Sequence, residues 1–261
     1  MPEIEETRTV TDEQVRFYQE SGFVQVDNVL TPLELAAMQQ EIDRIYSGAE
    51  GGIHTSAERS AYARVLDQRV NIWRDNAVVR AFVHLPRLAG MARRLAQVPA
   101  VRLWHDQALL KQPADSRPTP WHQDLPYWPM DAPGALSLWC ALDDVDERNG
   151  AMSFIPGSQR VGALPGINLV DPQDIFAMVP KGQLAGTQPV TARMRAGSCT
   201  FHNGLCFHYA GANRTDRPRR AMVIIYVPDG TLYNGRPHLV TDPLGLHAGD
   251  RLEGDMFPLL G

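Results

Sequence analysis

The sequence is poor in cysteine, and its few cysteines follow no spacing typical of a metal or redox motif. Cys140, Cys199 and Cys206 are odd in number and include no CxxC pair. This pattern argues against a zinc finger, a thioredoxin-like motif and a disulfide framework. Buried thiols in a reducing compartment are the simpler interpretation, and we therefore expect a cytoplasmic protein.

Long apolar runs and an excess of positive charge are also missing. The longest strongly apolar runs, such as "AMVIIYV" at Ala221–Val227, are too short to cross a bilayer. The first residues, "MPEIEETRTVTDEQ", are acidic and polar, unlike a signal peptide. The net charge of −5 provides no footprint for nucleic acid or anionic lipid. We therefore expect neither nucleic acid nor a membrane as a partner.

What is present begins with helix signals. Of the 261 residues, 44% are hydrophobic and 21% charged, as in ordinary globular proteins of one large domain. Thr11 and Gln14 form a capping-box pattern, and a second start signal with proline at the first helical position follows at 31–34. A third amphipathic run, with apolar residues from Leu88 to Val98, ends at Pro99.

After Pro99 the pattern changes to short apolar runs separated by Gly, Pro, Asn and Asp. Many short strands with turn signals between them predict an antiparallel sandwich or barrel. "ERNGAMSFIPGS" at 147–158 is typical of a tight hairpin entered through Asn149-Gly150. The predicted strands are Val101–Lys111, Leu136–Val145, Ala151–Ile155, Val190–Met194, Ser198–Phe207 and Ala221–Val227.

No convincing linker divides the chain. We predict a single domain over 1–261, with N-terminal helices over about 11–98, a β-core over about 100–228 and a tail over 229–261. The stretch 157–189 is rich in Gly and Pro and has little periodicity. Because long irregular loops are often functional, this stretch and the tail are predicted to be lids, with a functionless insertion as the rival interpretation.

"TPWHQDLPYWPM" at 119–130 places His122 and Asp124 two residues apart. With 8 histidines and 30 acidic residues, composition alone predicts about one such pair, so the pair decides little by itself. On an extended segment, residues i and i+2 point to the same face. An imidazole and a carboxylate held in this way can bind one divalent ion together.

The third ligand has to come from elsewhere in the chain. Non-heme iron oxygenases use two histidines and one carboxylate on a single face of Fe(II). His208 ends a strand-like run, and Arg219 stands eleven residues later, where the next strand begins. His202 competes with His208, although the spacing to Arg219 favours His208. Arg219 can grip a carboxylate with its bidentate fork, and Arg220 is expected to point out of the pocket.

On these residues the chain resembles the phytanoyl-CoA dioxygenase family, which comprises Fe(II)- and 2-oxoglutarate-dependent oxygenases with a double-stranded β-helix (jelly-roll) core. "HQDLPYWP" is similar to the iron-binding segment of the family, and "FHYAGANRTDRPRRA" is similar to its distal-histidine block. "LSLWCALDDVDERNGAMSFIPGSQ" and the opening "YQESGFVQVDNVLTPLELAAM" extend the likeness. The resemblance runs from about residue 11 to 228 and is weakest over 157–189.

The resemblance implies a role for each matching residue. His122, Asp124 and His208 become the iron ligands, and Arg219 binds the far carboxylate of 2-oxoglutarate. Ala210 departs from the pattern, because some members have a 2-oxoglutarate-binding serine there. Three further positions fall where the family lines the co-substrate pocket, namely Gln107, Lys111 and Trp139.

The resemblance also implies the reaction. Iron, O₂ and 2-oxoglutarate would oxidise a C–H bond of a small molecule, and hydroxylation in natural-product or small-metabolite biosynthesis is the default outcome. Cyclisation, desaturation and epimerisation remain alternatives, and the carboxylate of Asp124 disfavours halogenation. Tyr127 and Trp128 are equally interpretable as substrate walls and as packing residues. A non-catalytic jelly-roll binding module and a zinc hydrolase are the rival classes, and the hydrolase lacks an evident general base.

Overall fold

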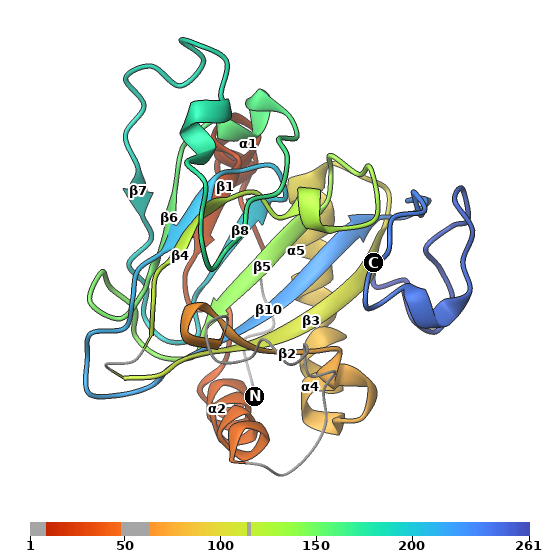
Figure 1. The fold of residues 1–261 in the computed structure, drawn as a ribbon. Coiled ribbons are helices and arrows are strands. Elements are labelled where there is room, and N and C mark those ends of the chain that lie inside the picture. The colour runs from red at the N-terminus through yellow and green to blue at the C-terminus, as the bar shows by residue number, and fades with distance from the viewer. Residues whose placement is uncertain (1–8, 48–62, 114–115) are drawn as a thin grey trace.

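Two antiparallel sheets form the centre of the protein. The structure, a computed structural model, describes residues 9–47, 63–113 and 116–261. Within these ranges the strands form a six-stranded sheet in the order β1-β8-β5-β10-β3-β2 and a four-stranded sheet in the order β4-β9-β6-β7 (Figure 1). The strands are β1 (Phe23–Val26), β2 (Asp67–Val70), β3 (Val101–Lys111), β4 (Thr119–His122), β5 (Leu136–Ala141), β6 (Met152–Phe154), β7 (Val190–Thr191), β8 (Cys199–Asn203), β9 (His208–Ala210) and β10 (Arg219–Pro228).

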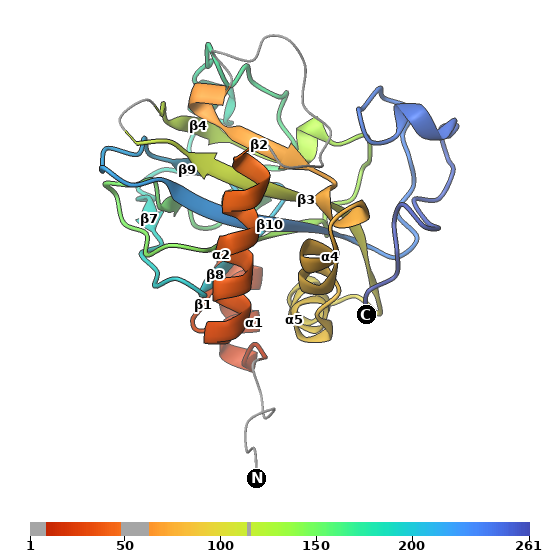
Figure 2. The same cartoon turned by 90° about the horizontal axis from the view of Figure 1, so that it is seen from below.

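The helices cover one face of the six-stranded sheet. They are α1 (Asp12–Ser21), α2 (Pro32–Tyr46), α4 (Ala77–Val83) and α5 (Pro86–Ala96), and Figure 2 shows them gathered on that face. The predicted capping boxes at Thr11 and Thr31 both form, and Gly22 ends α1 in the left-handed conformation at φ 79°. The expected helix starts and the antiparallel jelly-roll class are therefore confirmed.

Side-chain alternation along the strands creates two cores. On β10, Met222, Ile224 and Tyr226 pack against the helices, whereas Val223 and Ile225 face the four-stranded sheet. The same alternation on β3 and β5 sends every second side chain into the space between the sheets. This space holds the candidate site.

The N-terminal region contributes more than helices. β1 pairs with β8 and β2 pairs with β3, so both edges of the six-stranded sheet come from residues before Pro99. These four-residue strands lie between helix signals and give too short an alternation to be recognised from the sequence.

Two predictions about the strands are wrong, one about pairing and one about where a strand ends. The stretch 147–158 forms no hairpin, because β5 belongs to the six-stranded sheet and β6 to the four-stranded sheet. Asn149-Gly150 does make a turn, with Gly150 at φ 89°, but this turn carries the chain from one sheet to the other. The predicted strand Ser198–Phe207 stops at Asn203, and after a turn His208 begins β9 instead of ending a run.

The irregular stretch 157–189 packs on the four-stranded sheet through an apolar cluster of its own. Ile167 and Ile175 are buried there against Ile155 and Phe207. Among the described residues, no helix is long and apolar enough to span a membrane. The N-terminal residues 1–8 and His54, an unpartnered histidine in the sequence, lie outside the described residues.

Candidate metal centre and co-substrate pocket

The pairing of β4 with β9 brings two histidines together. His122 is the last residue of β4 and stands directly opposite His208, the first residue of β9. Their ring centroids are 4.1 Å apart, as expected for a close cross-strand pair. The two strands therefore place both imidazoles on the inner side of the four-stranded sheet.

A turn, not an extended strand, aims Asp124 at the histidines. β4 ends at His122, and Asp124 has helical backbone angles (φ −81°, ψ −46°) at the start of the short 3-10 helix Leu125–Tyr127. The backbone N–H groups of Asp124 and Leu125 both donate to the carbonyl of Gly204, at 2.9 and 2.8 Å. The predicted proximity is therefore correct, but its cause is this turn and not the strand pleat.

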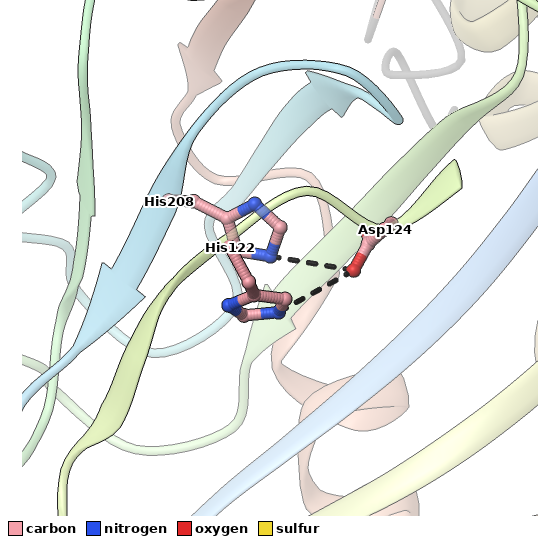
Figure 3. Close-up of side chains that lie close together, drawn as sticks. All are labelled: His122, Asp124 and His208. Atoms are coloured by element: carbon pink, nitrogen blue, oxygen red, sulfur yellow. Dashed lines mark ion pairs between the residues drawn. The ribbon is translucent and has the colours of Figure 1, made fainter. Parts of the chain in front are cut away.

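The three side chains converge on one point (Figure 3). Their ligand atoms all lie within 4.8 Å of one another. Oδ1 of Asp124 lies 3.6 Å from Nε2 of His122 and 3.4 Å from Nε2 of His208. This places two nitrogen atoms and one oxygen atom around a space of the size of a metal ion.

Backbone carbonyls fix the histidine rings. Nδ1 of His122 donates to the carbonyl of Pro120 at 2.7 Å, and Nδ1 of His208 donates to that of Cys206 at 3.0 Å. With the proton on Nδ1, the lone pair on each Nε2 faces Asp124 and is available for a metal.

The charge states suit a cation. Burial raises the pKa of Asp124, but the surrounding histidines His208, His122 and His202 outweigh burial and hold this pKa well below its usual value. Burial, with the neighbouring His208, lowers the pKa of His122. The carboxylate is therefore ionised and His122 neutral near pH 7, which are the forms that bind metal.

The second oxygen of Asp124 has separate partners. Ser137 Oγ donates to Oδ2 at 2.8 Å, and His202 Nε2 lies 3.2 Å from the same atom. His202 therefore belongs to the site as a partner of Asp124, whereas His208 completes the group of three side chains that could hold a metal ion. Ser137 could not be recognised from the sequence, because a serine in an apolar strand has no distinguishing pattern.

A cavity that is partly open to solvent adjoins the three ligand atoms. Gln107, Trp139 and Arg219 line it, as expected from the sequence. Arg219 is only 1% exposed, and its guanidinium lies 5.2 Å from the centre of the Trp139 ring. Nε and Nη1 of Arg219 have no hydrogen-bond partner among the described residues.

Arg220 points the other way, as predicted. Its guanidinium is paired with Asp143 at 2.6 Å and with Asp43 at 2.7 Å, outside the cavity. The side chains of Arg219 and Arg220 therefore point to opposite faces of the sheet, as successive residues of a strand do.

Lys111 does not line the cavity. Its ammonium group donates to the carbonyls of Val65 and Arg117, at 3.1 and 2.8 Å, and to the hydroxyl of Thr119 at 3.3 Å. Burial, with the nearby Arg219, lowers the pKa of Lys111 to about 6. Lys111 therefore holds the cavity residue Thr119 from behind. It does not line the co-substrate pocket itself, contrary to the expectation from the sequence.

Thr119 is a cavity residue that the sequence reasoning missed. It stands opposite Ala210 in the β4–β9 pair, and both residues line the cavity. The hydroxyl that Ala210 lacks is therefore present on the neighbouring strand. Its position three residues before His122 is the sequence feature that could have indicated that Thr119 lies near the site.

Trp128 lines the same cavity, whereas Tyr127 is tied to the stretch 157–189. The Tyr127 hydroxyl donates to the carbonyl of Ile167 at 2.7 Å and accepts from its N–H at 3.1 Å. On the other side, Arg236 of the tail donates to the carbonyls of Pro126 and Trp128. Hydrogen bonds thus link both irregular segments to residues 126–128, next to Asp124.

The donor set fits iron. Two imidazole nitrogens with free lone pairs and one ionised carboxylate oxygen, beside an open cavity, are the ligands of the two-histidine, one-carboxylate iron sites. The jelly-roll fold and this site together define a protein of the non-heme iron oxygenase class.

Comparisons with known proteins agree with this class. The sequence profile of the phytanoyl-CoA dioxygenase (PhyH) family matches residues 18–221. L-proline trans-4-hydroxylase of Streptomyces griseoviridis is 28% identical over 239 residues, covering 82% of this chain and 84% of the relative.

Two solved structures are similar over nearly the whole chain. The non-heme alpha ketoglutarate dependent carbocyclase SnoK from nogalamycin biosynthesis has a TM-score of 0.83 and 29% identity, covering 97% of each chain. The epimerase SnoN, in complex with Fe3+, alpha ketoglutarate and nogalamycin RO, has a TM-score of 0.78 and 31% identity, covering 96% of this chain and 98% of the other. The chain belongs to the phytanoyl-CoA dioxygenase family, and it is an Fe(II)- and 2-oxoglutarate-dependent dioxygenase.

Proposed function

We propose that His122, Asp124 and His208 hold the iron and that Arg219 binds the far carboxylate of 2-oxoglutarate. The observation that carries this proposal is the buried guanidinium of Arg219, with two unpartnered nitrogen atoms, in the same cavity as the three metal-ligand atoms. A buried cation without a partner is costly, and a carboxylate in this cavity would satisfy it.

Other side chains complete the co-substrate pocket. Thr119 supplies a hydroxyl beside Arg219, and the indole of Trp139 packs under the guanidinium. Lys111 donates to the oxygen of Thr119, and the Thr119 hydroxyl donates to the carbonyl of Val65 at 3.3 Å, so two contacts hold this side chain in place. Gln107 adds an amide to the cavity wall.

When bound, iron and 2-oxoglutarate supply the oxidant that removes hydrogen from a substrate carbon. The protein positions these reactants and limits the access of water. The Nε2 atoms of His122 and His208 and the ionised Asp124 present the ligands, and the apolar side chains of Leu109, Val223 and Ile225 line part of the cavity wall.

The substrate is proposed to be a small molecule of natural-product biosynthesis, oxidised at an unactivated C–H bond. The near-complete coverage of SnoK and SnoN, both from nogalamycin biosynthesis, supports this class. Hydroxylation remains the default outcome, and the carbocyclase and epimerase favour ring closure and epimerisation as the alternatives. The buried, unpaired thiols of Cys140, Cys199 and Cys206 support a cytoplasmic location.

Succinate formation tests the assignment of the site. We expect the purified protein with Fe(II), O₂ and 2-oxoglutarate to form succinate, and His122→Ala to abolish it. His247→Ala is the matched control, because the His247 side chain is 90% exposed. Unchanged succinate formation in His122→Ala would remove the assigned site.

Product mass distinguishes the reaction outcomes. With candidate natural-product precursors, hydroxylation adds one oxygen atom and ring closure removes two hydrogen atoms. Epimerisation gives an unchanged mass at a new retention time. Turnover of acyl-CoA substrates alone would contradict the proposed substrate class.

A further inference from the structure

The two oxygen atoms of Asp124 lie in different surroundings. Oδ1 faces the Nε2 atoms of both ligand histidines, at 3.6 and 3.4 Å. Oδ2 is directed away from this space, toward Ser137 and His202, at 2.8 and 3.2 Å. One oxygen is therefore presented to the metal, and the other is already occupied by protein donors.

The two donors are built into the six-stranded sheet. Ser137 on β5 and His202 on β8 are directly opposite each other in the strand register. Both are buried, with 1% and 2% exposure. Their separation is therefore set by the sheet, and they form a rigid cradle for Oδ2.

Among the described residues, Asp124 is the one hydrogen-bond partner of the His202 side chain. An ionised carboxylate only accepts hydrogen bonds, so Nε2 of His202 must carry a proton and donate it. Nδ1 of His202 is buried and has no partner among the described residues. A histidine that served only packing would be replaceable by an apolar ring at lower desolvation cost.

We infer that Ser137 and His202 are positioning residues that restrict Asp124 to coordination through Oδ1 alone. This inference rests on the proposed function. Two histidines and one carboxylate oxygen leave one face of an octahedral ion free. When bound, 2-oxoglutarate would chelate the metal, and one position would remain for O₂. A second oxygen from Asp124 would occupy that last position.

The test separates co-substrate binding from reaction with O₂. In the double variant Ser137→Ala, His202→Phe, we expect anaerobic chelation of 2-oxoglutarate by the Fe(II) protein to persist, with its visible absorption band. Decay of that band on exposure to O₂ should slow about 10–100-fold, the usual effect of removing partners of metal ligands. Restoring a donor in Ser137→Ala, His202→Gln should recover most of the rate.

A second measurement observes the carboxylate directly. With aspartate carboxyl groups labelled with ¹³C, the gap between the antisymmetric and symmetric infrared stretches is larger for one-oxygen than for two-oxygen coordination. We expect the metal-bound wild type to show the larger gap and the double variant the smaller one. This readout does not depend on turnover.

Thr200→Val is the matched control. Thr200 lies on β8 two residues before His202, is fully buried, and its hydroxyl has no partner among the described residues. The variant Thr200→Val should leave the infrared gap and the O₂ reaction unchanged.

Three results would contradict the inference. They are a large infrared gap retained in the double variant, parallel loss of 2-oxoglutarate binding and O₂ reaction, and no recovery with glutamine. Failure of the double variant to fold leaves the single variants Ser137→Ala and His202→Gln to be compared by the same infrared measurement. A wild-type protein without the absorption band would instead contradict the proposed function itself.

Discussion

Arg219 is a buried cation whose proposed partner is a ligand. Its guanidinium is buried over Trp139, and burial lowers its pKa to about 10, opposed by Asp143 and Tyr46 at longer range. Lys111, a second buried cation nearby, has three protein acceptors. Arg219 leaves Nε and Nη1 unpartnered among the described residues. A carboxylate of 2-oxoglutarate is the partner that we propose for these two nitrogen atoms.

Arg219→Met is expected to uncouple stability from binding. Removing an unpaired buried charge should leave the ligand-free protein at least as stable as wild type, because the desolvation cost disappears. Hydrogen bonds to charged groups are each worth about 1.5–3 kcal/mol, so 2-oxoglutarate binding should weaken about 100-fold. Thermal unfolding with and without 2-oxoglutarate measures both effects.

Arg193→Met is the control, because that side chain is 72% exposed and pairs with Glu147 at the surface. A variant Arg219→Met that is strongly destabilised yet still stabilised by 2-oxoglutarate would contradict the role given to Arg219.

A buried histidine outside the metal centre predicts how stability depends on pH. The strand bulge near Trp104 turns His105 inward, and burial, with His238 nearby, lowers its pKa to about 3. Between pH 6.5 and 3 the unfolded chain binds a proton at His105 that the folded protein does not. Stability therefore falls as the pH drops through this window.

His105→Gln should flatten this dependence. Between pH 6.5 and 5, His105 lowers the free energy of unfolding by about 2 kcal/mol, because one proton contributes about 1.4 kcal/mol per pH unit. The variant should lack this decrease. Urea unfolding of the metal-free protein at the two pH values measures it, with His247→Gln as the exposed control. An equal fall in stability in both variants would show that His105 is protonated in the folded state.

At the scale of elements, local signals predicted the helices well and the strand connections poorly. The caps at Thr11 and Thr31 depend on neighbouring residues, and both are as expected. The partner of β6 is decided by contacts far away in the sequence, so the Asn149-Gly150 turn suggested a hairpin that does not form. The turn at Asp124 likewise depends on the distant carbonyl of Gly204.

Gly204 is the point where two elements approach most closely beside the metal centre. A Cβ at this position would meet the Trp128 ring at 3.1 Å and the Leu125 Cβ at 3.2 Å. Gly204→Ala should therefore push the Asp124 turn outward, lowering metal affinity, at a stability cost of about 1–3 kcal/mol. Anaerobic Fe(II) titration and urea unfolding measure the two effects.

Gly90→Ala is the matched control, because its Cβ would meet nothing within 4 Å on α5. Since alanine is a better helix former, this variant should gain about 0.5–1 kcal/mol and bind metal normally. Normal metal affinity in Gly204→Ala would mean that the turn tolerates displacement and does not control the site.

At the scale of the whole molecule, the two sheets divide the work. The six-stranded sheet, supported by helices, carries Arg219, Trp139, Ser137 and His202, and the four-stranded sheet carries His122 and His208. The site therefore exists only when the sheets are packed together. The proximity of His122, Asp124, His208 and Arg219 could be predicted because they stand in compact motifs. Ser137 and Thr119 could not, because their importance arises from cross-strand neighbours.

Crystals grown without O₂ from protein loaded with Fe(II) and 2-oxoglutarate test the central claim most directly, through anomalous scattering at the iron edge. We expect one iron peak, bounded by His122 Nε2, Asp124 Oδ1 and His208 Nε2, and the far carboxylate of 2-oxoglutarate bound to Arg219. An iron peak elsewhere, or a 2-oxoglutarate carboxylate that leaves Arg219 unpaired, would contradict it.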